Sequence, residues 1–336
     1  MNKKTILVTG GLGLIGSTLI SKLNLLKEDH YIICVDSFRN NIKWKYLQKL
    51  IIDELISYED FDSQKLEIIN NSDIIYHLGA CSSTTEESWK YLYEKNYRST
   101  KEIIDIYINS KKGKCNSKKK LIIASSASTY GDGKNGFKDD FNDLEKLKPL
   151  NPYGMSKHLI DIYLKRKDYL SEVLSLKFFN IFGINELHKG NMRSIAHWGV
   201  ESILQNNVIK LFKSSNPNYK DGEQVRDFLD VNSAVELMYF LGNNYTGIHN
   251  IGCGNQITWN EMSNVIIKSL ESYRHNIKIE YVDMPNYLEG KYQYYTCAEM
   301  SRKVLPSQLY PLKENVFKML AKYSKEIFNY YLNEKL

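Results

Sequence analysis

Tyr153 and Lys157 stand four residues apart in a stretch with a helical pattern, which places a phenol and an ammonium on one helix face. A free tyrosine titrates near 10, so acting as a base near neutral pH requires a pKa lowered by about 3, worth roughly 4 kcal/mol. A neighbouring cation lowers the pKa of a phenol because it stabilises the phenolate. Ser126, after a predicted strand, can hydrogen-bond the same substrate oxygen. The three side chains predict proton transfer at a substrate hydroxyl, although the Tyr–Lys pair alone also fits an ordinary amphipathic helix.

A glycine-rich turn, TGGLGLIG at 9–16, follows a predicted strand and opens a predicted helix. Gly10 permits the tight turn, Gly13 lets the backbone approach a pyrophosphate, and Gly16 lets helix and strand pack closely. The helix N-terminus supplies free N–H groups and a favourable field for phosphate. Asp36 ends the next predicted strand about 20 residues later, where a ribose-binding carboxylate is expected. The pattern predicts a dinucleotide site, whose oxidised nicotinamide would add a second cation beside the phenol.

The choice between NAD and NADP depends on three residues near the end of that second strand. Asp36 favours NAD, since a carboxylate repels a 2′-phosphate. Arg39 and Lys43 follow closely and can neutralise that phosphate if they turn inward. The residue types therefore leave both cofactors open.

Short β-branched runs alternate with longer helical patterns in the first half of the chain. The gaps between the runs suit right-handed crossovers, which predicts an α/β fold with a doubly wound parallel sheet of the Rossmann type. The predicted strands are Thr5–Thr9, Tyr31–Val35, Asp73–Leu78, Leu121–Ser125 and Val173–Phe179, and the predicted helices are Ile15–Leu26, Ser88–Ile108 and Tyr153–Leu170.

The rhythm loosens after about Gly183, and a polar turn cluster at 216–222 predicts an irregular loop. We expect a dinucleotide-binding domain over 1–183 and a smaller α/β substrate lobe over 184–336, with segments of the two interleaved. In the second half the predicted helices are Ser194–Gln205, Ser233–Leu241 and Trp259–Leu270, and the predicted strands are Ile209–Phe212, Asp227–Val231 and Lys278–Val282.

Composition predicts a cytoplasmic globular protein. Apolar residues make up 43% of the chain and charged residues 25%, no apolar run reaches the roughly 18 residues of a membrane helix, and glycines interrupt the N-terminus before a signal-peptide core develops. The net charge of +6 equals the excess from six lysines between Lys111 and Lys120, which we interpret as a mobile, solvated loop rather than a nucleic-acid patch. The five cysteines lack metal or redox-motif spacing, so we expect reduced thiols and no metal site.

Several motifs resemble the extended short-chain dehydrogenase/reductase family, in family order over roughly the first 190 residues. They are the glycine turn, DIIYHLGA at 73–80, NYRST at 96–100, SSASTYG at 125–131 and the Tyr153/Lys157 pair. The resemblance implies a Rossmann domain that holds NAD(P) and a C-terminal lobe that holds a nucleotide-activated sugar.

Four further segments resemble the ADP-heptose 6-epimerases within that family: GACSSTTE at 79–86, HKGNM at 188–192, RDF at 226–228 and EGKYQYYT at 289–296. This resemblance implies an NADP-dependent enzyme that inverts C6″ of an ADP-heptose used for lipopolysaccharide core assembly, with Tyr153 and Lys189 as acid/base groups. Inversion through a ketone returns hydride to the opposite face, so a proton group is wanted on each side of the substrate. A simple phosphate contact is the other interpretation of Lys189.

The resemblance also implies the remaining site residues. Arg226 has a planar fork that matches a diphosphate, although an ion pair with Asp227 is an equal alternative. Where a substrate histidine is expected the chain has Trp198, with His197 one position away, and Tyr58 replaces a lysine expected at the NADP phosphate. Beyond the glycines and the Asp36 region, the expected cofactor contacts are Gly11, Leu14, Ile15, Ser37, Leu78, Gly79, Ala80, Cys81, Ser82, Asn96, Lys157, Ile181 and Lys189, and the expected substrate contacts are Ser83, Asn180, Asn191, Trp198, Phe212, Arg226 and Tyr292.

Other functions fit the sequence less well. A UDP-hexose 4-epimerase on the same fold is the nearest alternative. A 4,6-dehydratase needs an acid/base carboxylate pair beside the catalytic serine, where this chain has Ala127 and Ser128. A non-catalytic NADP-sensing regulator would be favoured by loss of Tyr153 or Lys157, and both are present. We expect a sugar-nucleotide substrate, a homo-oligomer, and neither a nucleic-acid nor a membrane partner.

Overall fold

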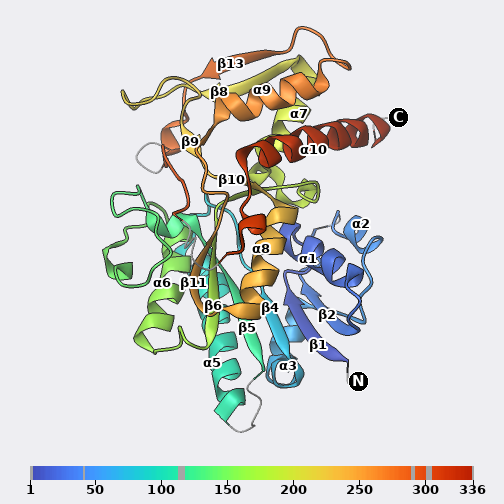
Figure 1. The fold of residues 1–336 in the computed structure, drawn as a ribbon, viewed down its shortest axis with the longest axis vertical. Coiled ribbons are helices and arrows are strands. Elements are labelled where there is room, and N and C mark those ends of the chain that lie inside the picture. The colour runs from blue at the N-terminus through green and yellow to red at the C-terminus, as the bar shows by residue number, and fades with distance from the viewer. Residues whose placement is uncertain (1–2, 41, 113–117, 289–291, 300–304, 335–336) are drawn as a thin grey trace.

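A seven-stranded sheet with every neighbouring pair parallel forms the centre of the protein in the computed structural model, which describes residues 3–40, 42–112, 118–288, 292–299 and 305–334 (Figure 1). The strand order is β11-β6-β5-β4-β1-β2-β3. The strands are β1 (Lys4–Thr9), β2 (His30–Asp36), β3 (Glu54–Ser57), β4 (Ile74–His77), β5 (Lys120–Ser126), β6 (Val173–Phe178) and β11 (Gly247–Ile251). The prediction of a doubly wound Rossmann-type sheet is confirmed.

Helices cover both faces of this sheet, as its β-branched strands require. All six residues of β6 are buried, which is typical of a parallel strand with helices on each side. One face packs on α1 (Leu14–Leu25) and α8 (Val231–Asn244), and the other on α3 (Tyr58–Asn71), α5 (Ser99–Lys112) and α6 (Pro152–Arg166). The chain enters α5 through α4 (Trp89–Leu92) and a π-helical stretch, Tyr93–Arg98.

A second group of elements lies beyond the carboxyl ends of the sheet strands, at the top of Figure 1. Strand β8 (Val208–Phe212) pairs in parallel with β13 (Lys278–Val282). Helices α7 (Ile195–Asn206), α9 (Trp259–Leu270) and α10 (Lys313–Glu334) pack with them, and a capping box between Thr258 and Glu261 begins α9. Shorter pairs join β7 (Asn180–Phe182) to β10 (Phe228–Asp230), and β9 (Val225–Arg226) to β12 (Ile257–Thr258).

Strand β11 lies far along the sequence, yet it pairs with β6 from Gly247 opposite Leu174 to Ile251 opposite Phe178. Helix α8, just before it, packs on the same sheet. Segments from beyond residue 183 therefore contribute to the central sheet. We propose that the two expected domains are divided near residue 183, with α8 and β11 returning to the first.

The sequence suggested that the lysine-rich stretch is one solvated loop, and the structure contradicts this interpretation. Lys119 is buried, and its ammonium donates to the backbone carbonyls of Ile69 and Asn70. Lys111 pairs with Glu172. A lysine next to a strand end can thus supply hydrogen bonds to buried backbone carbonyls. Residues 113–117, including Cys115, lie outside the described residues. In the described part of the chain, no helix is both long and apolar enough to span a membrane.

Candidate active site

A cavity of about 750 Å³ opens where the sheet meets the second group of elements. Such a position, at the carboxyl ends of parallel strands, is where open α/β sheets bind ligands. Most predicted site residues line it: Gly10, Gly13, Leu14, Ile15, Gly16, Asp36, Ser37, Arg39, Lys43, Leu78, Gly79, Ala80, Cys81, Ser82, Ser126, Tyr153, Asn180, Ile181, Lys189, Asn191, Trp198, Arg226 and Tyr292. Gly11, Ser83, Asn96, Lys157 and Phe212 do not line it.

The glycine turn has the close backbone contacts that a phosphate cradle needs. Gly10 has φ +67°, and a Cβ there would lie 2.7 Å from the Cα of Gly79. A Cβ on Gly16 would lie 2.2 Å from the carbonyl oxygen of Gly10, so Gly16 permits the turn to fold on itself. The N-cap residue of α1 is Gly13, which has no side chain to cap the helix, and this leaves N–H groups of the first turn for an anion. These residues fit the pyrophosphate of a dinucleotide.

Asp36 is held at the end of β2 by three donors. Its carboxylate accepts hydrogen bonds from the backbone N–H groups of Leu12 at 2.8 Å and Ser37 at 2.6 Å, and lies 2.5 Å from the ammonium of Lys43. Both expected cations line the cavity, and of the two it is Lys43 that pairs with Asp36. The Arg39 side chain is 74% exposed and pairs with Glu59.

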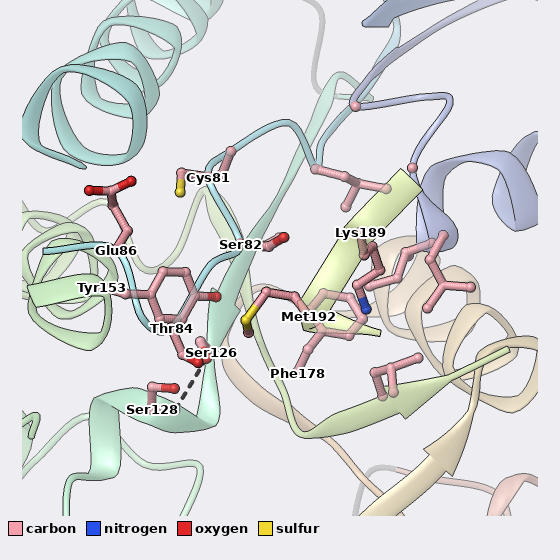
Figure 2. A pocket seen from close by; sticks show the side chains of 18 of the residues that line it. Cys81, Ser82, Thr84, Glu86, Ser126, Ser128, Tyr153, Phe178, Lys189 and Met192 are labelled. Carbon is pink, nitrogen blue, oxygen red and sulfur yellow. Dashed lines mark hydrogen bonds between the residues drawn. The ribbon is translucent and has the colours of Figure 1, made fainter. Parts of the chain in front are cut away.

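Tyr153 lies in the first turn of α6, where Asn151 caps the helix by accepting the N–H of Gly154 at 2.7 Å. Its ring is buried, and its hydroxyl hydrogen-bonds the side chain of Ser126. Burial raises the pKa of Tyr153, and the bond to Ser126 opposes that rise. Figure 2 shows the Tyr153 ring beside Ser126, whose hydroxyl also accepts the N–H of Ser128 at 3.2 Å.

Lys157 lies one turn further along α6, beneath the cavity. Its ammonium donates to the carbonyl of Ala124 at 2.9 Å, and burial lowers its pKa to about 8, with Asp161 opposing the change. The expectation that Lys157 lowers the pKa of Tyr153 stays a prediction. In the described side chains Ser126 lowers that pKa, and Lys157 ties α6 to the end of β5.

Lys189 reaches the cavity from the short 3₁₀ segment Leu187–Met192. Its ammonium lies 3.2 Å from the carboxylate of Glu186, which is fully buried. Glu186 also accepts the N–H groups of Gly183 and Ser194 and the hydroxyl of Ser194. In Figure 2, Lys189 and Tyr153 come from different elements, with Met192 drawn between them. A phenol and an ammonium group therefore enter one cavity from separate directions.

The Arg226 guanidinium stacks over the Tyr292 ring, 4.8 Å from its centroid, and both line the cavity. The alternative of an ion pair with Asp227 is wrong for the described structure. Asp227 instead accepts three backbone N–H groups, from Cys253, Gly254 and Ala298. The Arg226 cation is thus left facing the cavity.

Residues 6–252 match the sequence model of the NAD dependent epimerase/dehydratase family. This chain belongs to that family. It is 39% identical over 300 residues to the ADP-L-glycero-D-manno-heptose-6-epimerase of Nitratidesulfovibrio vulgaris, which covers 88% of this chain and 90% of the relative. It is 36% identical over 311 residues to the enzyme of the same name from Fusobacterium nucleatum, with the same coverage.

Solved structures show the same fold. The Helicobacter pylori ADP-L-glycero-D-manno-heptose-6-epimerase aligns with a TM-score of 0.76 and 23% identity, covering 97% of this chain and 96% of that one. A UDP-N-acetylglucosamine 4-epimerase from Methanobrevibacter ruminantium aligns with a TM-score of 0.79 and 23% identity, covering 98% and 100%. The resemblance inferred from the motifs is confirmed, and this family member is an NAD(P)-dependent epimerase of a sugar nucleotide.

Predicted residues that do not line the cavity of this epimerase contact the residues that do. The side-chain amide of Asn96 pairs with both backbone groups of Cys81 and donates to Ser156. Phe212 packs edge-on against Tyr292 at 6.4 Å. His197 turns away from the cavity and bonds the carbonyls of Gly183 and Ile184.

The residues of this site that sequence reasoning missed include Glu186, which pairs with Lys189, and Met192 and Trp259, which line the cavity. Glu186 stands three residues before Lys189, a spacing that brings opposite charges together in one helical turn, and this was the available signal. Trp259 packs edge-on against Phe228 at 5.1 Å and lines the cavity. Nothing in its local sequence distinguishes it from a core aromatic residue.

Proposed function

We propose that the protein is an ADP-glyceromanno-heptose 6-epimerase, which interconverts the D-glycero and L-glycero forms of ADP-manno-heptose by oxidation and re-reduction at C6″. The observation that carries this proposal is the entry of Tyr153 and Lys189 into one cavity from different elements. The names of the curated relatives supply the substrate.

The chain's own residues account for the proton steps. Tyr153, hydrogen-bonded to Ser126, would take the proton from the C6″ hydroxyl during oxidation. A nicotinamide held by the glycine turn and the Asp36 region would supply the hydride acceptor and donor. After the ketone turns in the cavity, Lys189 gives a proton to the same oxygen in the opposite pose. Lys189 is suited to this step because its pairing with Glu186 at 3.2 Å holds the side chain in place beside the cavity. Arg226 and Tyr292 bind the diphosphate end of the substrate.

NADP is the cofactor we propose, because Lys43 turns toward the ribose-binding carboxylate and can meet a 2′-phosphate. An epimerase returns its hydride to the same substrate, so the nucleotide should stay bound through turnover. Denaturing the purified protein and identifying the released nucleotide tests this. Recovery of NAD alone would reject NADP and leave the epimerase assignment standing.

The decisive experiment is incubation of the purified protein with ADP-D-glycero-D-manno-heptose while NMR follows the configuration at C6″. Appearance of the L-glycero epimer, with Tyr153→Phe inactive, is the expected result. An unchanged spectrum together with turnover of a UDP-hexose would instead assign a 4-epimerase.

A further inference from the structure

His188, the residue before Lys189, is bound to the segment that follows β2. Its backbone carbonyl accepts the side-chain amide of Asn40 at 3.1 Å. Its Nδ1 shares a hydrogen bond of 3.3 Å with the hydroxyl of Tyr46, and the two rings meet edge-on at 5.7 Å. Tyr46 is buried, so these contacts are shielded from competing water.

The segment that holds His188 also carries Lys43, which pairs with Asp36. Backbone hydrogen bonds connect the three positions: the N–H of Lys43 bonds the carbonyl of Asn40, and the N–H of Tyr46 bonds the carbonyl of Lys43. Asn40 also accepts the N–H of Ile42 at 2.9 Å. One short hydrogen-bonded segment therefore presents Lys43 to the ribose end of the cofactor site and two other side chains to His188.

The bond between Tyr46 and His188 requires an imidazole that is not doubly protonated. Burial, together with the cations Lys43 and Lys189, lowers the pKa of His188 to about 4, against the opposing charge of Glu186. His188 is therefore neutral at physiological pH, and Nδ1 can accept the Tyr46 proton.

The other side of the Lys189 loop is fixed independently. The N–H of Lys189 bonds the carbonyl of Glu186 at 2.8 Å. Arg193 binds the carbonyl of Gly190, the Tyr331 hydroxyl in α10 and the carboxylate of Glu201. With that side anchored, the contacts of His188 act together with the Glu186 carboxylate to position the first half of the loop and the Lys189 side chain.

We propose that His188 is a positioning residue for Lys189, and that Asn40, Tyr46 and His188 form a bridge that couples the adenosine-ribose end of the cofactor site to Lys189. The importance of this bridge for turnover rests on the proposed function. The physical coupling does not, since it concerns only the position of one ammonium group. Filling the ribose end would fix Lys43 and, through the segment, the loop that carries Lys189.

The coupling can be measured without substrate. Adenosine 2′,5′-bisphosphate is a suitable probe because it carries the ribose phosphates of NADP without the nicotinamide half. Lys189 is acylated with acetic anhydride, and mass spectrometry compares its rate with that of the exposed Lys325. We expect the probe to slow acylation of Lys189 roughly 3- to 10-fold in the unchanged protein and to have little effect in Tyr46→Phe or His188→Ala, while calorimetry shows that these variants still bind it.

Turnover supplies the second measurement. Tyr46→Phe and His188→Ala should each lower kcat roughly 5- to 20-fold with little change in KM, and the double variant should be no worse than either, because both remove the same contact. His188→Asn should recover much of the activity, since an amide can replace Nδ1. Additive losses, or a probe effect that persists in Tyr46→Phe, would overturn the bridge. An active Lys189→Ala alongside an intact probe effect would overturn the proposed role of Lys189 and leave the bridge standing.

Discussion

The ammonium of Lys189 lies 3.2 Å from a carboxylate oxygen of Glu186, whose side chain is fully buried. The same carboxylate accepts hydrogen bonds from the backbone N–H of Gly183 at 2.9 Å, at one end of the loop, and from that of Ser194 at 2.7 Å, at the other end. Glu186 thus closes the loop and fixes the Lys189 charge in one place. A cation tethered in this way makes a directed proton donor, because its position does not depend on the substrate.

Replacing Glu186 with glutamine should make stability less dependent on acidic pH. Burial alone would raise the pKa of Glu186, but Lys189, His197 and the bonds from Ser194 and Gly183 outweigh it and the pKa lies below its usual value. A lowered folded-state pKa adds stability above the unfolded value of about 4.3, and this stability is lost as pH falls through the folded value.

Urea unfolding at pH 7, 5, 4 and 3 measures the effect. We expect Glu186→Gln to cost on the order of 3 kcal/mol at pH 7, as for a broken buried pair, and to lose less further stability on acidification than the unchanged protein. Glu59→Gln, which removes an exposed pair with Arg39, is the matched control and should alter neither. Parallel pH curves for the two variants would contradict the assignment.

Lys189→Ala separates the two roles considered for this lysine. If Lys189 is a proton donor, the variant should lose about 100-fold or more in kcat with KM little changed. If Lys189 only binds a phosphate, KM should rise while kcat at saturation stays near normal. Lys43→Ala changes another lysine of the same cavity and should weaken cofactor retention, but it should lower kcat far less than Lys189→Ala when NADP is in excess. Steady-state kinetics on both variants would exclude catalysis by Lys189 if they behaved alike.

Ser126→Ala should move the pH profile of kcat/KM toward higher pH. The hydroxyl of Ser126 opposes the effect of burial on the pKa of Tyr153, so its removal raises that pKa and less phenolate forms near neutrality. At pH 7 the rate should fall roughly 10- to 100-fold, the scale of a hydrogen bond to a charged group, and should recover partly at alkaline pH. Ser128→Ala is the control, because only its backbone N–H contacts Ser126. A uniform loss at every pH would refute this role.

The sequence predicts the elements around the nucleotide well, because glycine and β-branched patterns are local signals. Trp259–Leu270 and Lys278–Val282 are even found at their observed bounds. Strand β3 was missed because it has four residues, two of them exposed. No local sequence pattern in strand β11 predicts its pairing with β6, because the tertiary fold brings these two distant segments together.

The candidate site shows the same limit. Tyr153 and Ser126 could be named from spacing and motif, and the structure joins them. The sequence could not decide whether the Arg226 side chain faces the cavity or pairs with Asp227. The three N–H groups that donate to the Asp227 carboxylate belong to residues at least 26 positions away. The bond from Tyr46 to His188 spans 142 positions, and no pattern along the chain reports such a contact.

The ion pair between Asp161 and Lys177 carries the last prediction, because it supports the catalytic helix from inside the core. Both side chains are fully buried, with 3.4 Å between the charged atoms. Asp161, on α6, also accepts the hydroxyls of Ser125 and Ser175 at 3.0 and 2.8 Å, which ties the helix of Tyr153 to β5 and β6. Removing either charge leaves the other unpaired in the protein core, where no water can solvate it.

We expect Asp161→Asn and Lys177→Met each to destabilise the protein by roughly 3 to 5 kcal/mol, and the double variant to recover much of that loss, since no uncompensated buried charge then remains. Lys322→Met, in an exposed pair with Glu326, should leave the unfolding midpoint unchanged. The double variant should remain slower in turnover, because Asp161 opposes the lowering of the pKa of Lys157 by burial and anchors α6 beside Ser126. Chemical denaturation gives the coupling energy directly. Strictly additive losses would show that Asp161 acts through its serine contacts rather than through the charge of Lys177.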